Sequence, residues 1–137
     1  MAVEMSGEIL EVLIYLQDIF GDQYAPARVK AYVVALADIN IIQLRAGASK
    51  LARSSRFLPR LAEIRSAAQA CEIMPIEPLI RRREGLRYQS WCEGGYDGSA
   101  WDELYERCWS AGYWDLARYV EQVKSRCEKV SAEVEPV

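Results

Sequence analysis

Residues 54–65 read SSRFLPRLAEIR, and this stretch decides how the first half of the chain folds. Pro59 fixes its own φ angle and disfavours the α conformation at Leu58, so the chain must become extended there. We expect Phe57 and Leu58 to fill the space between two helices, and Pro59 to start the second helix. The stretch therefore predicts a sharp bend inside a bundle of helices.

Helical periodicity extends upstream of this bend. We expect a first helix between Ser6, as its N-cap, and Gly21, as its stop. Pro26 and Asn40 mark the starts of two further helices. Gly47, in the helix after Asn40, either weakens that helix or allows a neighbour to pack closely. The expected inward stripe of the first helix is Ile9, Val12, Leu13, Leu16, Ile19 and Phe20.

Helical signals also fill the rest of the chain, and no useful length of sequence alternates with the period of a β-strand. Pro75 and Pro78 interrupt the chain and open a basic fifth helix. Ser99 and Asp102 form a box-like start for a sixth helix, which Gly112 ends. A seventh helix leads into a tail that we expect to fray. The sequence therefore predicts an all-α protein.

The prediction divides this all-α chain into three parts. Residues 1–74 form a four-helix bundle, residues 75–98 form a basic connecting segment with a glycine-rich loop, and residues 99–137 form a helical hairpin with the frayed tail. The hairpin either docks on the bundle or stands apart from it.

The composition argues against several classes of function. The chain has no histidine, which removes Ser-His and Cys-His nucleophile systems and the commonest general base. Its four cysteines are widely spaced, so we expect buried free thiols, and neither a metal site nor a cofactor. No apolar run approaches the ~18 residues of a membrane span, and the N-terminus lacks the basic region of a signal peptide. We expect a cytoplasmic protein that is not an enzyme and has no membrane partner.

The net charge of −3 is unevenly distributed along the chain. Residues 28–90 carry twelve Lys and Arg against five acids, whereas residues 91–137 carry ten acids against five bases. The basic part is either a phosphate-binding surface or a solvated face paired with the acidic ends of the same chain. The candidate nucleic-acid contacts are Arg45, Lys50, Arg53, Arg56, Arg60, Arg81, Arg82, Arg83 and Arg87.

Eight Trp and Tyr residues concentrate between positions 91 and 119. Trp101, Tyr105 and Trp109 are four residues apart and so share one side of a helix. These rings form the core of the hairpin, or they are exposed anchors for a protein partner, because Trp and Tyr are frequent at interface hot spots. The candidate partner contacts are Trp101, Tyr105, Trp109, Tyr113 and Trp114, and we expect the last three to be the most exposed.

The sequence around the bend also resembles a known family. A basic helix with a serine-containing end, an aromatic-apolar pair, and then Pro and Ala-Glu-Ile resemble the N-terminal helical domain of the tailed-phage replicative-helicase loader/inhibitor family. The matching residues are Arg53, Ser54, Phe57, Leu58, Pro59, Ala62, Glu63 and Ile64. Residues 32–39 resemble the helix before them, so the resemblance covers about residues 7–72. Arg60 departs from the Ser or Thr expected after the proline, which leaves the helix start without a local side-chain acceptor.

This resemblance implies a small non-enzymatic adaptor that binds a hexameric replicative helicase, loads or inhibits it, and also contacts an origin-binding partner. Two alternatives remain open at this point. The protein is a nucleic-acid-binding regulator or replisome organiser that uses its basic middle segment, or it is a small inhibitor that blocks a host protein complex through the acidic aromatic hairpin.

Overall fold

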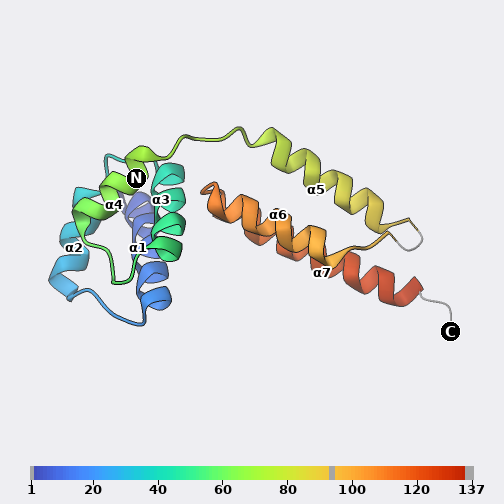
Figure 1. Cartoon of the computed structure of the whole chain (residues 1–137), viewed down its shortest axis with the longest axis horizontal. Coiled ribbons are helices and arrows are strands. Elements are labelled where there is room, and N and C mark those ends of the chain that lie inside the picture. The colour runs from blue at the N-terminus through green and yellow to red at the C-terminus, as the bar shows by residue number, and fades with distance from the viewer. Residues whose placement is uncertain (1, 93–94, 135–137) are drawn as a thin grey trace. The chain divides into compact units, whose positions relative to one another are not determined.

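The computed structural model describes residues 2–92 and 95–134 of the 137-residue chain. This part of the protein is all-α, as predicted, with seven helices and no strand among the described residues (Figure 1). The helices are α1 (Ala2–Phe20), α2 (Pro26–Ala35), α3 (Ile41–Ser54), α4 (Leu61–Ala70), α5 (Glu77–Ser90), α6 (Gly98–Ser110) and α7 (Trp114–Val134). None of the described helices is both long enough and apolar enough to cross a lipid bilayer.

The chain folds as two compact units. The first unit contains α1 to α4 together with the short segment Ser110–Gly112. The second unit contains α5, α6 except its last residue, and α7. Along the sequence, the boundary between the units falls between Ile73 and Met74. The segment that we expected to connect two parts therefore contains a helix of the second unit, α5, which packs on α7.

The core of the first unit forms where α1 packs on α2 and α3, and α3 packs on α4. Ile9, Val12, Leu13 and Leu16 of α1 are buried, as the periodicity predicted. The predicted stripe is wrong at its end, because Ile19 is exposed and Phe20 is only half-buried. Both residues lie in the last turn of α1, where Gly21, with φ of 63°, turns the chain out of the helix.

Helices α3 and α4 approach each other closely at Gly47. A Cβ atom built on Gly47 would lie 2.7 Å from the backbone nitrogen of Ala68, which is closer than non-bonded atoms can pack. Leu44 and Ala48 of α3 and Ile64 of α4 are fully buried. Of the two roles expected for Gly47, close packing with a neighbouring helix is confirmed.

The bend at Pro59 is filled differently from the prediction. Pro59 itself is fully buried, whereas the side chain of Phe57 is 81% exposed and Leu58 is half-buried. The buried Tyr24 lies beside the proline instead, and its hydroxyl donates a 2.5 Å hydrogen bond to the Pro59 carbonyl. Because Tyr24 and its neighbour Tyr32, with ring centroids 5.2 Å apart, occupy this space, Phe57 is left in solvent. The prediction that Phe57 fills the core is wrong.

The starts of two helices in the first unit also differ from the prediction. Ser6 lies inside α1 and does not cap it. Helix α4 begins at Leu61, so its N-cap is Arg60 and Pro59 lies before the helix. The Glu63 carboxylate accepts the backbone N–H of Arg60 at 3.3 Å. The start of α4 thus has a side-chain acceptor, three residues downstream, which is one half of a capping box.

Elsewhere the capping signals were partly right. The Asn40 side chain accepts a backbone N–H at 2.8 Å at the start of α3, as predicted. Helix α6 begins before the predicted box of Ser99 and Asp102, because the Asp97 carboxylate accepts the N–H of Ser99 at 3.0 Å. Gly112, with φ of 91°, follows the end of α6 as expected.

The core of the second unit contains two tryptophans. The Trp101 indole N–H donates to the Ser90 hydroxyl at 3.2 Å, and that hydroxyl donates to the Leu86 carbonyl at 2.7 Å. These bonds satisfy the polar groups that accompany a buried indole. The buried residues of this unit include Leu79, Leu86, Ser90, Trp101, Leu104, Cys108, Trp114, Ala117, Val120, Val123 and Cys127.

The cysteines only partly follow the expectation of buried thiols. Cys108 and Cys127 are buried, Cys71 is half-buried, and Cys92 is exposed. Burial raises the pKa of the Cys108 thiol to about 11, so this sulfur is held in its neutral form. Cys92 is exposed because it follows the end of α5, in a turn at the protein surface.

Candidate partner-binding site

The aromatic residues of α6 and α7 mostly contact one another. The Trp109 ring stacks on Tyr105, with centroids 6.0 Å apart, and on Trp114, with centroids 4.3 Å apart and planes at 5°. The Trp114 indole N–H also donates to the Trp109 carbonyl at 3.1 Å. Trp114 and Trp101 are fully buried. The structure therefore brings three of the five predicted partner contacts, Tyr105, Trp109 and Trp114, into one stack, and it places Trp101 in the core beside Ser90.

The prediction that Trp109, Tyr113 and Trp114 are the most exposed anchors is wrong. Trp114 is fully buried, and Trp109 and Tyr113 are half-buried. The reason is that the rings on either side of the Gly112 turn stack on each other. In addition, the Arg118 guanidinium lies 5.9 Å from the Trp109 ring centroid, and the Tyr113 hydroxyl donates to the Met74 carbonyl.

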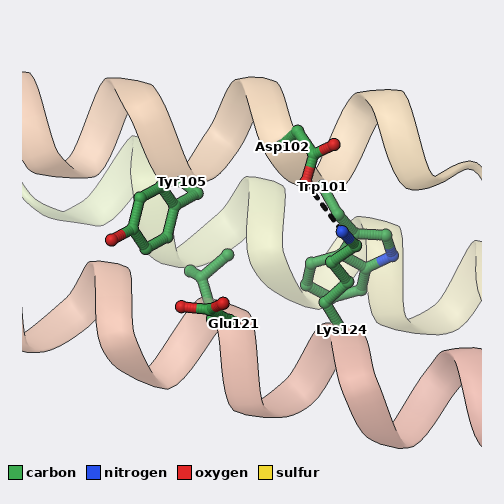
Figure 2. A pocket seen from close by; sticks show the side chains of 6 residues that line it. Trp101, Asp102, Tyr105, Glu121 and Lys124 are labelled. Atoms are coloured by element: carbon green, nitrogen blue, oxygen red, sulfur yellow. Dashed lines mark hydrogen bonds and ion pairs between the residues drawn. The ribbon is translucent and has the colours of Figure 1, made fainter.

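A small hollow of about 240 Å³ lies between α6 and α7. Figure 2 shows the Lys124 side chain reaching to Asp102 across this hollow, while Tyr105 and Glu121 lie farther along it. The Lys124 ammonium contacts the Asp102 carboxylate at 2.8 Å, and this hydrogen bond raises the pKa of Lys124. Asp102 is therefore part of an ion pair between the two helices. The hollow is lined by Trp101, Asp102, Tyr105, Val120, Glu121 and Lys124.

The most exposed aromatic residues of the second unit are Tyr88, on α5, and Trp91, the C-cap of this helix. The side chain of Tyr88 is 79% exposed and that of Trp91 is 67% exposed. Together with Glu84 and Arg87 they recur at the i, i+3, i+4 and i+7 spacing that places residues on one face of a helix. These four residues line a surface hollow of about 360 Å³. One face of α5 therefore presents two large rings and a guanidinium to solvent.

Two arginines contact aromatic rings on this side of the unit. The Arg87 guanidinium lies 5.7 Å from the Trp91 ring centroid, and the Arg83 guanidinium lies 4.7 Å from the ring of Tyr119 on α7. Such cation–π contacts restrain the rings and the guanidinium groups. We call the set of Arg83, Arg87, Tyr88, Trp91 and Tyr119 the Trp91 surface.

A second, larger hollow adjoins the Trp91 surface between α5 and α7. Its volume is about 420 Å³, with an apolar lining that includes Val123 and Val130 and basic groups from Arg126 and Lys129. The lining residues are Glu84, Arg87, Trp91, Tyr119, Val123, Arg126, Cys127, Lys129 and Val130. Trp, Tyr and Arg are the residue types most enriched at the energetic centres of protein interfaces. The arrangement is suited to binding a protein segment that has apolar anchors and acidic neighbours.

Sequence reasoning missed this surface although its signal was present. Trp91 and Tyr119 were counted among the clustered aromatic residues but not chosen as contacts. The spacing of Glu84, Arg87, Tyr88 and Trp91 marks one helix face, but spacing alone does not say whether that face is covered.

The predicted nucleic-acid contacts divide between the two units. In the first unit Arg45 is only 4% exposed, because residues 44–49 of α3 are all buried. Arg45 is therefore not a surface contact, and that prediction is wrong. The other candidates in this unit, Lys50, Arg53, Arg56 and Arg60, are exposed.

The remaining candidates are on α5, in the second unit. Arg81 and Arg82 are exposed. Arg83 and Arg87 both contact Glu84, with nitrogen–oxygen distances of 3.0 Å and 3.7 Å. The positive charge of these two arginines is therefore partly offset within the helix.

Comparisons with protein-family models, with curated proteins and with solved structures found no match to this chain. In the described part of the chain, no group of three or more His, Cys, Asp or Glu side chains is placed to hold a metal ion.

Proposed function

We propose that the protein is a non-enzymatic adaptor of phage DNA replication that acts in the cytoplasm, binds a hexameric replicative helicase, and loads or inhibits it. Two features support this proposal. The first is the resemblance of residues 7–72 to the phage helicase loader/inhibitor family, which points to the helicase as partner. The second, and the observation that carries the proposal, is the exposed Trp91 surface, which gives such an adaptor a contact site.

Exposed rings of this size favour a protein partner on physical grounds. Each large aromatic side chain removes roughly 150–250 Å² from water when it becomes buried. Tyr88 and Trp91 lie next to each other on one helix face, so a single partner element can cover both rings. Their burial would contribute much of the free energy of a specific interface.

The geometry also reduces the entropic cost of binding. Trp91 has few rotatable bonds, and Arg87 lies beside its ring. Tyr119 is on α7 and is restrained by Arg83 in the same way. A surface that is ordered before the partner arrives loses less conformational freedom on association.

The charges around the larger hollow indicate the chemistry of the partner segment. Arg87, Arg126 and Lys129 line it together with a single acid, Glu84. An apolar segment flanked by acidic residues matches both the lining and its net positive charge. We propose that the helicase presents such a segment to the Trp91 surface.

The test is co-sedimentation of the full chain with the hexameric replicative helicase of its host. The Tyr88→Ala/Trp91→Ala double variant should bind at least about 10-fold more weakly, because truncation of two hot-spot rings costs on the order of 2 kcal/mol or more. Val34→Ala is the matched control, since Val34 is an exposed apolar residue of the first unit. Circular dichroism should show all three proteins folded. Wild-type affinity in the double variant would refute the proposed contact.

A further inference from the structure

The first unit carries a separate exposed surface around Phe57. We call the set of Lys50, Arg53, Arg56, Phe57 and Arg60 the Phe57 edge. All five side chains are exposed, and they occupy the last turn of α3, the bend, and the N-cap of α4. None of these residues belongs to the Trp91 surface, so the two surfaces can be tested independently.

The bend holds Phe57 in its exposed position. The Ser55 hydroxyl donates to the Phe57 carbonyl at 3.1 Å. The following Pro59 is buried, and its carbonyl accepts the hydrogen bond from the Tyr24 hydroxyl. The backbone on both sides of Phe57 is therefore fixed, and its ring stands in water on an anchored turn. A side chain on a backbone that is already fixed loses less conformational freedom when it binds a ligand.

The basic residues of the Phe57 edge have no acidic partner among the residues that the structure describes. The sequence contains no acid between Asp38 and Glu63. In the described part of the chain, no ion pair involves any of the four basic residues of the edge. Arg53 instead donates to the Ser49 carbonyl at 3.4 Å. By contrast, Arg65 on α4 forms a two-pronged ion pair with Asp38, at 2.9 Å and 3.0 Å.

These observations point to a ligand that carries several negative charges and also aromatic rings. Four uncompensated cations within eleven residues attract phosphates, which release condensed counterions when they are neutralised. The exposed Phe57 ring offers a face on which an unpaired base can stack, and such stacking tolerates any base. Duplex DNA keeps its bases stacked inside the helix and offers no such partner to a single ring.

We propose that the Phe57 edge binds single-stranded nucleic acid, with Phe57 stacking on one base and Lys50, Arg53, Arg56 and Arg60 contacting phosphates. The α5 arginines are less suited to this role, because Glu84 offsets the charge of Arg83 and Arg87, and each of these two guanidinium groups lies against a ring. The proposal goes beyond the adaptor function and does not depend on it.

The first arm of the test measures how many phosphate contacts the Phe57 edge makes. The full chain is titrated against a fluorescent oligo(dT) of about 20 nucleotides, by anisotropy, at several salt concentrations. A slope of log K against log[salt] of about −2 to −3 is expected for three or four phosphate contacts. The Arg56→Gln/Arg60→Gln variant should lower the magnitude of this slope by about 1.4. An unchanged slope in that variant would overturn the proposal.

The second arm measures stacking. Phe57→Ala should weaken oligo(dT) binding by roughly 5- to 150-fold, because a base–aromatic stack is worth about 1–3 kcal/mol. Its salt slope should not change, since no phosphate contact is lost. Phe57→Trp should retain binding, and Val34→Ala serves as the control for an unrelated exposed apolar residue.

Competitors separate this site from a general anion site. Unlabelled duplex DNA and inorganic polyphosphate should both compete more weakly than unlabelled oligo(dT). If polyphosphate competes as well as oligo(dT), and Phe57→Ala keeps full affinity for oligo(dT), the Phe57 edge binds anions without contacting bases. Equal competition by duplex DNA would likewise contradict a single-strand site. Oligo(dT) affinity unaltered in both variants, with loss of binding to a protein partner, would assign the edge to a protein interface.

Discussion

At the residue scale, a single hydroxyl supports the bend between α3 and α4. The buried Tyr24 hydroxyl donates to the Pro59 carbonyl, and burial raises the pKa of this phenol. The group therefore stays protonated and remains a donor at all ordinary pH values. Pro59 needs this partner, because its buried carbonyl has been removed from water.

Tyr24→Phe should lower the free energy of unfolding by about 1–3 kcal/mol, because the Pro59 carbonyl is left buried without a donor. Phe57→Ala, at an exposed site, should change it by no more than about 0.5 kcal/mol. Chemical denaturation with a common slope measures both. A larger loss in Phe57→Ala than in Tyr24→Phe would show that Phe57 fills the core after all.

Gly47 is a second residue at which a single atom, an added Cβ, should change the stability of the fold. Alanine is the better helix former by about 1 kcal/mol, but its Cβ would meet the backbone nitrogen of Ala68 at 2.7 Å. Backbone atoms of a packed helix cannot move aside without a loss of stability. The cost of overpacking, about 1–3 kcal/mol, should therefore exceed the gain in helix propensity. Gly47→Ala is therefore expected to lower the melting temperature. Gly85→Ala is the control, because a Cβ at that α5 position meets nothing within 4 Å. An increase in melting temperature for Gly47→Ala would contradict the close packing.

At the element scale, an ion pair ties α4 to the end of α2. The Arg65 guanidinium donates to both Asp38 oxygens and, at 2.6 Å, to the Ala35 carbonyl in the last turn of α2. The hydrogen bond from Arg65 lowers the pKa of Asp38 below its usual 3.8. A carboxyl with a lowered folded pKa stabilises the fold above its unfolded pKa and loses that effect as the pH falls through the folded pKa.

Asp38→Asn should therefore melt below the wild type at pH 6 to 7. The difference in melting temperature should shrink as the pH falls below 3.8 and disappear once Asp38 is protonated in the folded protein. Thermal melts of the two proteins between pH 7 and pH 2 test this. A difference in melting temperature that stays constant from pH 7 to pH 2 would mean that the Asp38 charge contributes nothing to the stability of the fold.

The helices themselves were largely predictable, because periodicity and capping are local signals. Asn40 and Gly21 act as the sequence indicated. The largest error arose where a long-range contact overrides the local pattern. Tyr24, thirty-five residues from Pro59, takes the space expected for Phe57. The start of α6 is a different, local error, because the Asp97 carboxylate caps this helix two residues before the expected Ser99.

The candidate site was less predictable than the fold for the same reason. Clustered rings indicate that aromatic contacts matter, but their exposure depends on which rings stack on each other. Trp109 and Trp114 cover one another across a turn, whereas Tyr88 and Trp91 share a helix face that remains exposed. A one-dimensional pattern cannot distinguish these two outcomes.

At the scale of the whole molecule, each unit carries its own exposed surface. The Trp91 surface combines rings with arginines whose charge is partly offset by Glu84. The Phe57 edge combines one ring with cations that have no acidic partner in the described part of the chain. The different charge balance suggests different ligands, which we propose are a helicase segment and a nucleic-acid strand.

The most direct test of the central claim is the affinity of the helicase for the Tyr88→Ala/Trp91→Ala and Phe57→Ala variants, measured by biolayer interferometry on the same helicase preparation. The Trp91 surface predicts that the double variant loses at least about 10-fold in affinity while Phe57→Ala binds like the wild type. Full helicase affinity in Tyr88→Ala/Trp91→Ala would contradict the account, because the exposed rings of α5 would then have no part in the contact.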